Sequence, residues 1–266
     1  MTIRTSRAAA VAIAVAALLP ACSGDAPAPS ADSPSADSRS AASPSSSASP
    51  SSRSPSSPSS PSAGPSVYVA VGASETVGLG ADDPATQAWP VVLHDRELPE
   101  ARLVDVGVSG STVEGALRSQ LPAALAAGPD VATVWLAVND LITGVPVRAY
   151  QRRLQRLVHA LRRDGRTDVI VGNVPDLWRL PAYRACLPGE RSGVSCVLPF
   201  VPSEAQVRAE VARFNRAVRT VVRREGARLA DLSGVPFGAR LTSSDGFHPS
   251  TAGHRRIAAV FARGLP

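Results

Sequence analysis

Short apolar runs alternate with longer amphipathic segments over the C-terminal three quarters of the chain. The runs are rich in β-branched residues and have the length of strands, whereas the segments between them repeat their apolar residues at helical spacing. The run at 131–138 is apolar almost throughout, as expected for a central parallel strand. The predicted strands are 67–72, 102–106, 131–138, 168–172 and 227–232, and the predicted helices are 87–98, 111–127, 146–163, 203–225 and 250–263.

This alternation, repeated five times, predicts an α/β fold in which a parallel sheet carries helices on both faces. Residues 174–202 fit neither pattern and contain five Pro, so we expect an irregular segment there. The aromatic residues of this segment are Trp178, Tyr183 and Phe200. They either line a substrate pocket or pack the loop, and both interpretations stay open.

Composition separates the N-terminal quarter from this pattern. Of the 44 residues at 23–66, 37 are Ser, Pro or Ala, and none is Leu, Ile, Val or aromatic. Such a segment has too little apolar surface to form a core, so we expect a disordered tether. Residues 67–266 remain, enough for one domain with a sizeable core.

The first 22 residues have the pattern of an export signal. Arg4 and Arg7 precede the apolar stretch Ala8–Leu19, which is too short to span a bilayer. It ends in Leu19-Pro20-Ala21-Cys22, which resembles a bacterial lipobox, with Cys22 as the lipidated residue. Pro20 departs from that pattern, so an ordinary signal peptide cut near Ala21 or further on is the alternative.

Export with lipidation predicts anchoring to the outer face of the cytoplasmic membrane, and export alone predicts secretion. A coil of the tether's length has an end-to-end distance of about 40 Å, which would hold the domain clear of the membrane. Cys186 and Cys196 lie ten residues apart in the irregular segment, and an oxidising compartment favours a disulfide between them. A metal pair is the alternative, but no His or third Cys is near.

The formal net charge is +6, and every basic residue is Arg. Many of these lie on the predicted helices 146–163 and 203–225. Their arrangement fits a solvated outer face, or contact with an anionic membrane or cell-wall polymer. No basic stretch contains interleaved aromatic residues, so we expect no nucleic-acid partner.

Candidate chemistry gathers where the predicted strands end, which is where parallel sheets carry their functional residues. Ser74 follows the first strand, and Asp245 and His248 stand before the last helix. Ser74 is the candidate nucleophile, His248 the base that takes its proton, and Asp245 the group that orients the imidazole. The amides of Ser74 and Gly110 and the side-chain amide of Asn139 are candidate donors to an oxyanion.

These residues stand in blocks that resemble the SGNH hydrolase family, also called GDSL esterases. The resemblance covers residues 67–266 and implies a flavodoxin-like sheet of order 2-1-3-4-5. It also implies a Ser74–His248–Asp245 triad, an oxyanion hole of Ser74, Gly110 and Asn139, and no metal or cofactor. The blocks are Val71-Gly-Ala-Ser74, Asp105-Val-Gly-Val-Ser-Gly110, Ala137-Val-Asn139-Asp140 and Asp245-Gly-Phe-His248-Pro249.

Two positions depart from the family pattern: Ala73 replaces a usual aspartate, and Ala137 replaces a frequent glycine. Each block alone also fits a plain structural role, such as a helix cap for Ser74, and their occurrence together favours catalysis. We therefore expect a monomeric serine esterase acting on an O-acyl ester or thioester of a lipid, an acetylated wall polymer or a small acyl compound. The alternative is a weak or inactive surface binding lipoprotein on the same scaffold.

Overall fold

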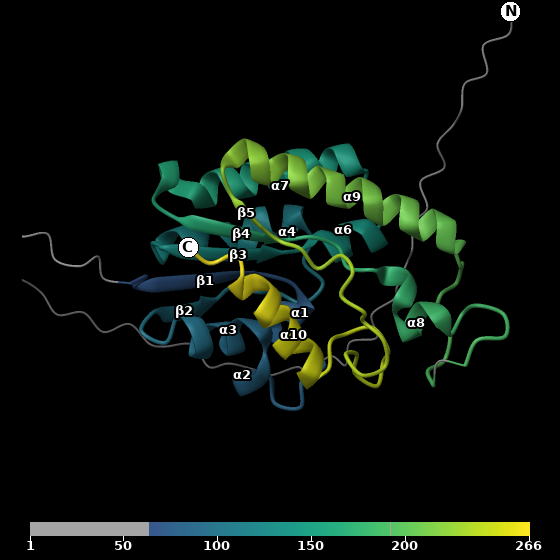
Figure 1. Cartoon of the computed structure of the whole chain (residues 1–266). Helices are drawn as coiled ribbons and strands as arrows, with labels where there is room; N and C mark the ends of the chain where they lie inside the picture. The colour runs from purple at the N-terminus through teal and green to yellow at the C-terminus, as the bar shows by residue number, and fades with distance from the viewer. Residues whose placement is uncertain (1–63, 192) are drawn as a thin grey trace, which may run out of the picture. The chain divides into compact units, whose positions relative to one another are not determined.

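The computed structural model describes residues 64–191 and 193–266. Its centre is a five-stranded parallel sheet of order β2-β1-β3-β4-β5, which confirms the expected fold (Figure 1). The predicted signal peptide 1–22, Cys22 and nearly all of the predicted tether lie outside the described residues. The strands are β1 Val67–Gly72, β2 Arg102–Asp105, β3 Val131–Trp135, β4 Asp168–Gly172 and β5 Arg228–Ala230.

Helices cover both faces of the sheet (Figure 1). One layer holds α4 Val113–Ser119, α5 Leu121–Ala126, α6 Ala137–Ile142, α7 Val147–Arg162 and α9 Glu204–Glu225. The other holds α1 Ser74–Val77, α2 Pro84–Gln87, α3 Trp89–Glu97 and α10 Thr251–Ala262. The α8 helix, Pro181–Arg184, lies at the carboxyl edge of the sheet, and single 3-10 turns occupy Arg163–Gly165 and Leu177–Arg179.

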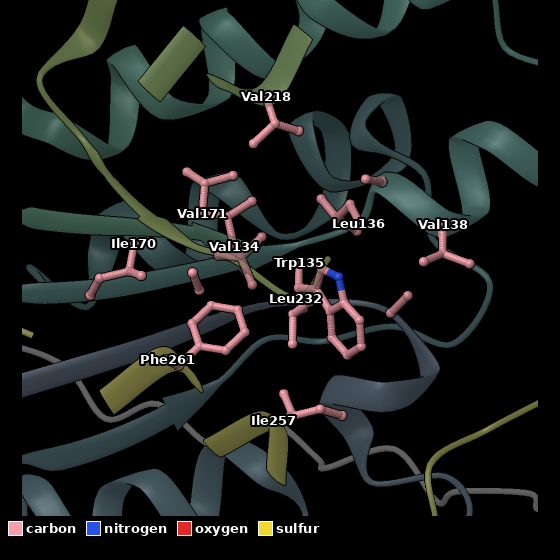
Figure 2. Packing of buried hydrophobic residues seen from close by; sticks show 14 of the residues in the cluster. Val134, Trp135, Leu136, Val138, Ile170, Val171, Val218, Leu232, Ile257 and Phe261 are labelled. Carbon is pink, nitrogen blue, oxygen red and sulfur yellow. The ribbon is translucent and has the colours of Figure 1, made fainter. Parts of the chain in front are cut away.

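The core joins these three layers. Every residue of β3 is buried, as its apolar sequence predicts. Figure 2 shows Val218 of α9 on one side of the strand residues Val134 and Trp135, and Phe261 of α10 on the other. Phe261 also stacks on Trp89 of α3 with ring centroids 4.3 Å apart. Because Phe→Ala or Trp→Ala in such positions costs about 3–5 kcal/mol, these rings hold α3 and α10 firmly against the sheet.

Two predicted elements differ in the structure, each for a local reason. The strand expected at 131–138 ends at Trp135, because the chain turns at once into α6. The helix expected at 111–127 is two helices, since Pro122 cannot supply the hydrogen bond that would continue α4. The helix expected at 87–98 is present as α3, and the short helix α2 precedes it.

The segment 174–202 is irregular apart from α8 and one 3-10 turn. Cys186 and Cys196 form a disulfide within it. Two aromatic side chains make contacts here: the Tyr183 hydroxyl donates to the carbonyl of Pro202, and the Arg208 guanidinium lies 4.1 Å from the Trp178 ring centroid. Phe200 is exposed.

Candidate active site

A tight turn between β1 and α1 presents Ser74. The chain passes from the last strand residue, Gly72, through Ala73 into a helix that begins at Ser74 itself. A Cβ on Gly72 would lie only 1.9 Å from the Thr76 hydroxyl oxygen, so only glycine allows the helix to start this close to the strand. The turn therefore places the Ser74 side chain at the carboxyl edge of the sheet.

The side chain of Gln120 stabilises this turn by hydrogen bonds to the backbone of Gly72. Its Oε1 accepts from the Gly72 amide at 3.0 Å, and its Nε2 donates to the Gly72 carbonyl at 2.9 Å. Gln120 is buried at the junction of α4 and α5, so it extends the hydrogen bonding of β1 in place of a neighbouring strand. Sequence reasoning missed this residue, because a lone Gln in a helical segment carries no signal for such a role.

Ser74, His248 and Asp245 form one hydrogen-bonded row. The Ser74 hydroxyl lies 3.1 Å from His248 Nε2, and His248 Nδ1 lies 2.5 Å from Asp245 Oδ2. Burial raises the pKa of Asp245, but hydrogen bonds from His248, the Phe247 amide and Ser243 outweigh it and hold that pKa well below its usual range. Asp245 is thus a stable anion beside the imidazole.

Close packing of α10 and the loop before it on the segment after α1 holds His248 against Ser74. Gly80 has a φ of +95°, and a Cβ there would lie 2.3 Å from the Pro249 carbonyl oxygen. His254 of α10 accepts from the Trp89 amide through Nδ1 and donates to the Leu79 carbonyl through Nε2, each at 3.2 Å. These contacts connect both ends of the domain at the site.

Asn139 and the loop that carries Gly110 lie beside this row. The Val108 amide donates to the Gly72 carbonyl at 3.1 Å, which joins the loop after β2 to the turn before Ser74. Asn139 Nδ2 donates one hydrogen to the Ser111 carbonyl at 3.0 Å, so its second hydrogen can face a substrate. Gly110 has a φ of +76°, a conformation that suits glycine.

Asp140 anchors the Asn139 turn. It is fully buried, its Oδ2 accepts from the Val113 amide at 2.8 Å, and its Oδ1 is without a hydrogen-bond partner in the part of the chain that the structure describes. Burial raises the pKa of Asp140 to about 6, although the Val113 amide and Arg153 oppose the shift. The carboxyl thus connects α6 to the start of α4 at a cost in desolvation.

A mostly apolar pocket opens at the same edge of the sheet. Its cavity volume is about 20 Å³, and its mouth is open to solvent. Sequence reasoning missed this pocket, because distant segments come together to form it. Its lining residues are Glu75, Trp135, Val138, Pro175, Leu177, Leu180, Phe237, Phe247 and Pro249.

Among residues 64–191 and 193–266, no cluster of His, Cys, Asp and Glu side chains is arranged to hold a metal ion. In the same residues no helix has the length and apolar character needed to cross a membrane.

Comparison with known proteins gives one family and several related folds. Residues 70–256 match the model of the GDSL-like lipase/acylhydrolase family. No curated protein matches the chain. Among solved structures, TesA superposes with a TM-score of 0.58 at 24% identity, over 75% of this chain and 97% of its own.

Two further structures have similar scores. The psychrotrophic esterase EstA from Pseudoalteromonas sp., inhibited by monoethylphosphonate, has a TM-score of 0.55 at 17% identity, over 74% of this chain and 95% of its own. The extracellular lipase from Streptomyces rimosus has a TM-score of 0.54 at 17% identity, over 75% of this chain and 100% of its own. At these identities the likeness establishes a shared fold.

Proposed function

Because the chain belongs to the GDSL-like lipase/acylhydrolase family, it is a serine hydrolase of ester bonds, and we propose that it acts through an acyl-enzyme on Ser74. The observation that carries this proposal is the hydrogen-bonded row from Ser74 through His248 to Asp245. A serine hydroxyl is a weak nucleophile unless a base takes its proton, and this row supplies the base and the anion that orients it.

In the first half of the reaction, Ser74 Oγ attacks the carbonyl carbon of the ester while His248 Nε2 accepts the hydroxyl proton. The Asp245 carboxylate stabilises the resulting imidazolium. The tetrahedral oxyanion accepts hydrogen bonds from the amides of Ser74 and Gly110 and from Asn139 Nδ2. His248 then protonates the leaving alcohol, and the acyl group remains on Ser74.

In the second half, a water molecule gives its proton to His248 and attacks the acyl carbon. Collapse of the second tetrahedral intermediate releases the carboxylic acid and returns the proton to Ser74. Ala73 is buried against the core and brings no side-chain hydrogen bond to the turn. The Gln120 side chain stabilises the turn instead, through its two hydrogen bonds to the Gly72 backbone.

The substrate class is an O-acyl ester of a lipid, an acetylated wall polymer or a small acyl compound. The pocket beside Ser74 supports a short acyl group, since its space is limited and most of its lining is apolar. We further propose that the protein is exported and held by lipid at Cys22 to the outer face of the cytoplasmic membrane. The sequence of residues 1–22 supports this.

The outer faces of α7 and α9 lie side by side and carry exposed arginines, among them Arg152, Arg156, Arg216 and Arg223 (Figure 1). We propose that this surface faces the anionic membrane or wall near the anchor. Salt should weaken such contact, because exposed charges are screened at high ionic strength.

Labelling with a fluorophosphonate probe, together with hydrolysis of p-nitrophenyl esters, tests the acyl-enzyme. Wild type should be labelled and active, whereas Ser74→Ala should be unlabelled and lose far more than a hundredfold in kcat/KM. Ser244→Ala, which changes an exposed serine in the loop of Asp245, is the matched control and should keep both properties. Residual Ser74→Ala activity above roughly a hundredth of wild type would exclude Ser74 as the nucleophile.

A further inference from the structure

The lining of the pocket includes chain neighbours of Ser74, Asn139 and His248. Glu75 follows the nucleophile Ser74, Val138 precedes Asn139, and Phe247 and Pro249 flank His248. An acyl group bound to Ser74 Oγ would therefore extend toward this pocket. Groups in its lining are placed to contact the part of the substrate adjoining the carbonyl carbon.

Among the residues that line the pocket, Glu75 has the one charged side chain, and Trp135 has the one other side chain that can form hydrogen bonds. The Trp135 N–H is already used, because it donates to the Asn173 carbonyl at 3.0 Å. Glu75 is only 6% exposed, so its carboxyl has lost most of its water. A carboxyl in such surroundings is costly unless something hydrogen-bonds to it.

Ser74 cannot satisfy Glu75 and take part in catalysis at the same time. The Ser74 hydroxyl lies 3.4 Å from Glu75 Oε2 and 3.1 Å from His248 Nε2, and it has one proton to donate. When that proton faces His248, as attack requires, Glu75 Oε2 loses this donor. Burial raises the pKa of Glu75, against the lowering effect of His248 nearby. A hydrogen-bonding group on the substrate can take the place that the serine proton leaves.

We propose that Glu75 selects the acyl group, favouring esters that carry a hydrogen-bond donor, a hydroxyl or an ammonium, on the carbon next to the carbonyl. That carbon is one bond from the acyl carbon attached to Ser74 Oγ, so its substituent comes within reach of Oε2. Plain alkyl acyl groups offer Glu75 Oε2 no donor in place of the Ser74 hydroxyl and bind less well in the transition state. The inference rests on the proposed function, because it needs the acyl group to be attached to Ser74.

Three p-nitrophenyl esters of nearly equal size test the proposal: 2-methylpropanoate, 2-hydroxypropanoate and 2-aminopropanoate. They place a methyl, a hydroxyl or an ammonium at the same position. The intrinsic reactivities of the esters differ, so the quantity to compare is the ratio of kcat/KM between two esters, in wild type and in each variant. Those reactivities cancel in this comparison.

Glu75→Leu should lower the preference for the hydroxyl and the ammonium ester over the methyl ester by tenfold or more relative to wild type. Glu75→Gln keeps hydrogen bonding without a negative charge, so it should retain most of the hydroxyl preference and lose the ammonium preference. Leu180→Ala widens the same pocket without altering its charge, and as a control should change the three esters by similar factors.

An equal loss for all three esters in Glu75→Leu would overturn the proposal, since Glu75 would then act on Ser74 or His248 rather than on the substrate. Unchanged ester ratios would overturn it as well. Fluorophosphonate labelling of each variant shows whether Ser74 is still reactive. If Glu75→Leu is labelled but its ester ratios are unchanged, only the selection by Glu75 is contradicted. If wild type is neither labelled nor active, the acyl-enzyme on Ser74 is contradicted as well.

Discussion

The two carboxylate oxygens of Asp245 bind different groups. Oδ1 accepts from the Ser243 hydroxyl and from the amides of Phe247 and His248, at 2.8, 2.8 and 2.9 Å. Oδ2 is left to accept from the imidazole at 2.5 Å. Asp245 therefore shapes the loop and orients the ring, and its removal should affect catalysis differently from the removal of His248.

We expect His248→Ala to be inactive at every pH, because no base remains for Ser74. Asp245→Ala should keep weak activity, with the acidic limb of kcat/KM moved to lower pH, since the imidazolium loses its stabilising anion. Profiles of kcat/KM against pH for both variants check this. Asp245→Asn keeps an oxygen acceptor for the loop amides but has no charge, so its acidic limb should shift in the same direction. If the Asp245 variants keep full activity and an unshifted acidic limb, the catalytic group is a Ser–His dyad.

Asn139→Ala should lower kcat by roughly 10²–10³ with little change in KM, as expected when one oxyanion donor is lost. Steady-state kinetics with a short-chain p-nitrophenyl ester measure both constants. The variant also loses the hydrogen bond to the Ser111 carbonyl, so circular dichroism checks that it is still folded. A change confined to KM would instead make Asn139 a substrate-binding residue.

At the scale of elements, two buried amides secure the ends of strands. Gln120 binds both backbone groups of Gly72, and Asn215 of α9 binds both backbone groups of Val174 at 2.8 and 2.9 Å. Each side chain extends a strand where the sheet ends, so each should contribute to stability. Only the first lies next to Ser74, which makes the pair a matched test.

Gln120→Leu and Asn215→Leu should each lower the free energy of unfolding by about 2–3 kcal/mol, because buried backbone groups are left unpaired. Gln120→Leu should in addition lower kcat, since the turn that carries Ser74 loses its support, while Asn215→Leu should keep most of its kcat. Urea unfolding and steady-state kinetics provide the two measurements. Equal effects on kcat would mean that Gln120 acts through stability alone.

The α10 helix brings a pH dependence to the fold through His254. Burial lowers the pKa of His254 to about 4 from an ordinary 6.5, although the Leu79 carbonyl opposes the shift. The unfolded chain therefore binds this proton more readily than the folded one, and stability falls as the pH drops from about 6.5 to about 4. The two pKa values correspond to a loss of roughly 3 kcal/mol.

Urea unfolding of wild type and His254→Gln at pH 7 and pH 4 measures this loss. The variant has no titrating ring at this position, so it should lose less stability between the two pH values than wild type. The difference between the two losses is the contribution of His254. Parallel curves for the two proteins would show that another group accounts for the acid sensitivity.

At the scale of the whole molecule, we predict a lipid anchor at Cys22, outside the catalytic domain. Mass spectrometry of the mature protein should find Cys22 at the N-terminus with a diacylglyceryl group. The Cys22→Ser form should appear in the medium, whereas wild type should sediment with membranes. Wild type found free in the medium would support cleavage by an ordinary signal peptidase.

The sequence predicted the strands of the sheet and the residues of the Ser–His–Asp row, because these depend on local patterns. A buried run marks β1, and the Asp-x-x-His spacing lies within a single turn. The strand order came from the family resemblance, which periodicity alone does not supply.

Features that depend on contacts between distant segments could not be predicted in this way. Gln120 reaches Gly72 across 48 residues, and Phe237 meets Glu75 only in the folded pocket. The end of β3 was misplaced for a different reason: Leu136 to Val138 stay apolar as the chain turns from strand into helix, so hydropathy does not mark the change.

The bond between Ser74 and His248 joins residues 174 positions apart, so the proposed base is among the last parts of the domain to be synthesised. While the chain is being made, Ser74 already exists but has no partner to take its proton. A nascent or truncated chain that stops before Asp245 should therefore be chemically silent toward esters inside the cell. Catalysis would begin only when the loop of Asp245 and His248 has packed against the turn that carries Ser74.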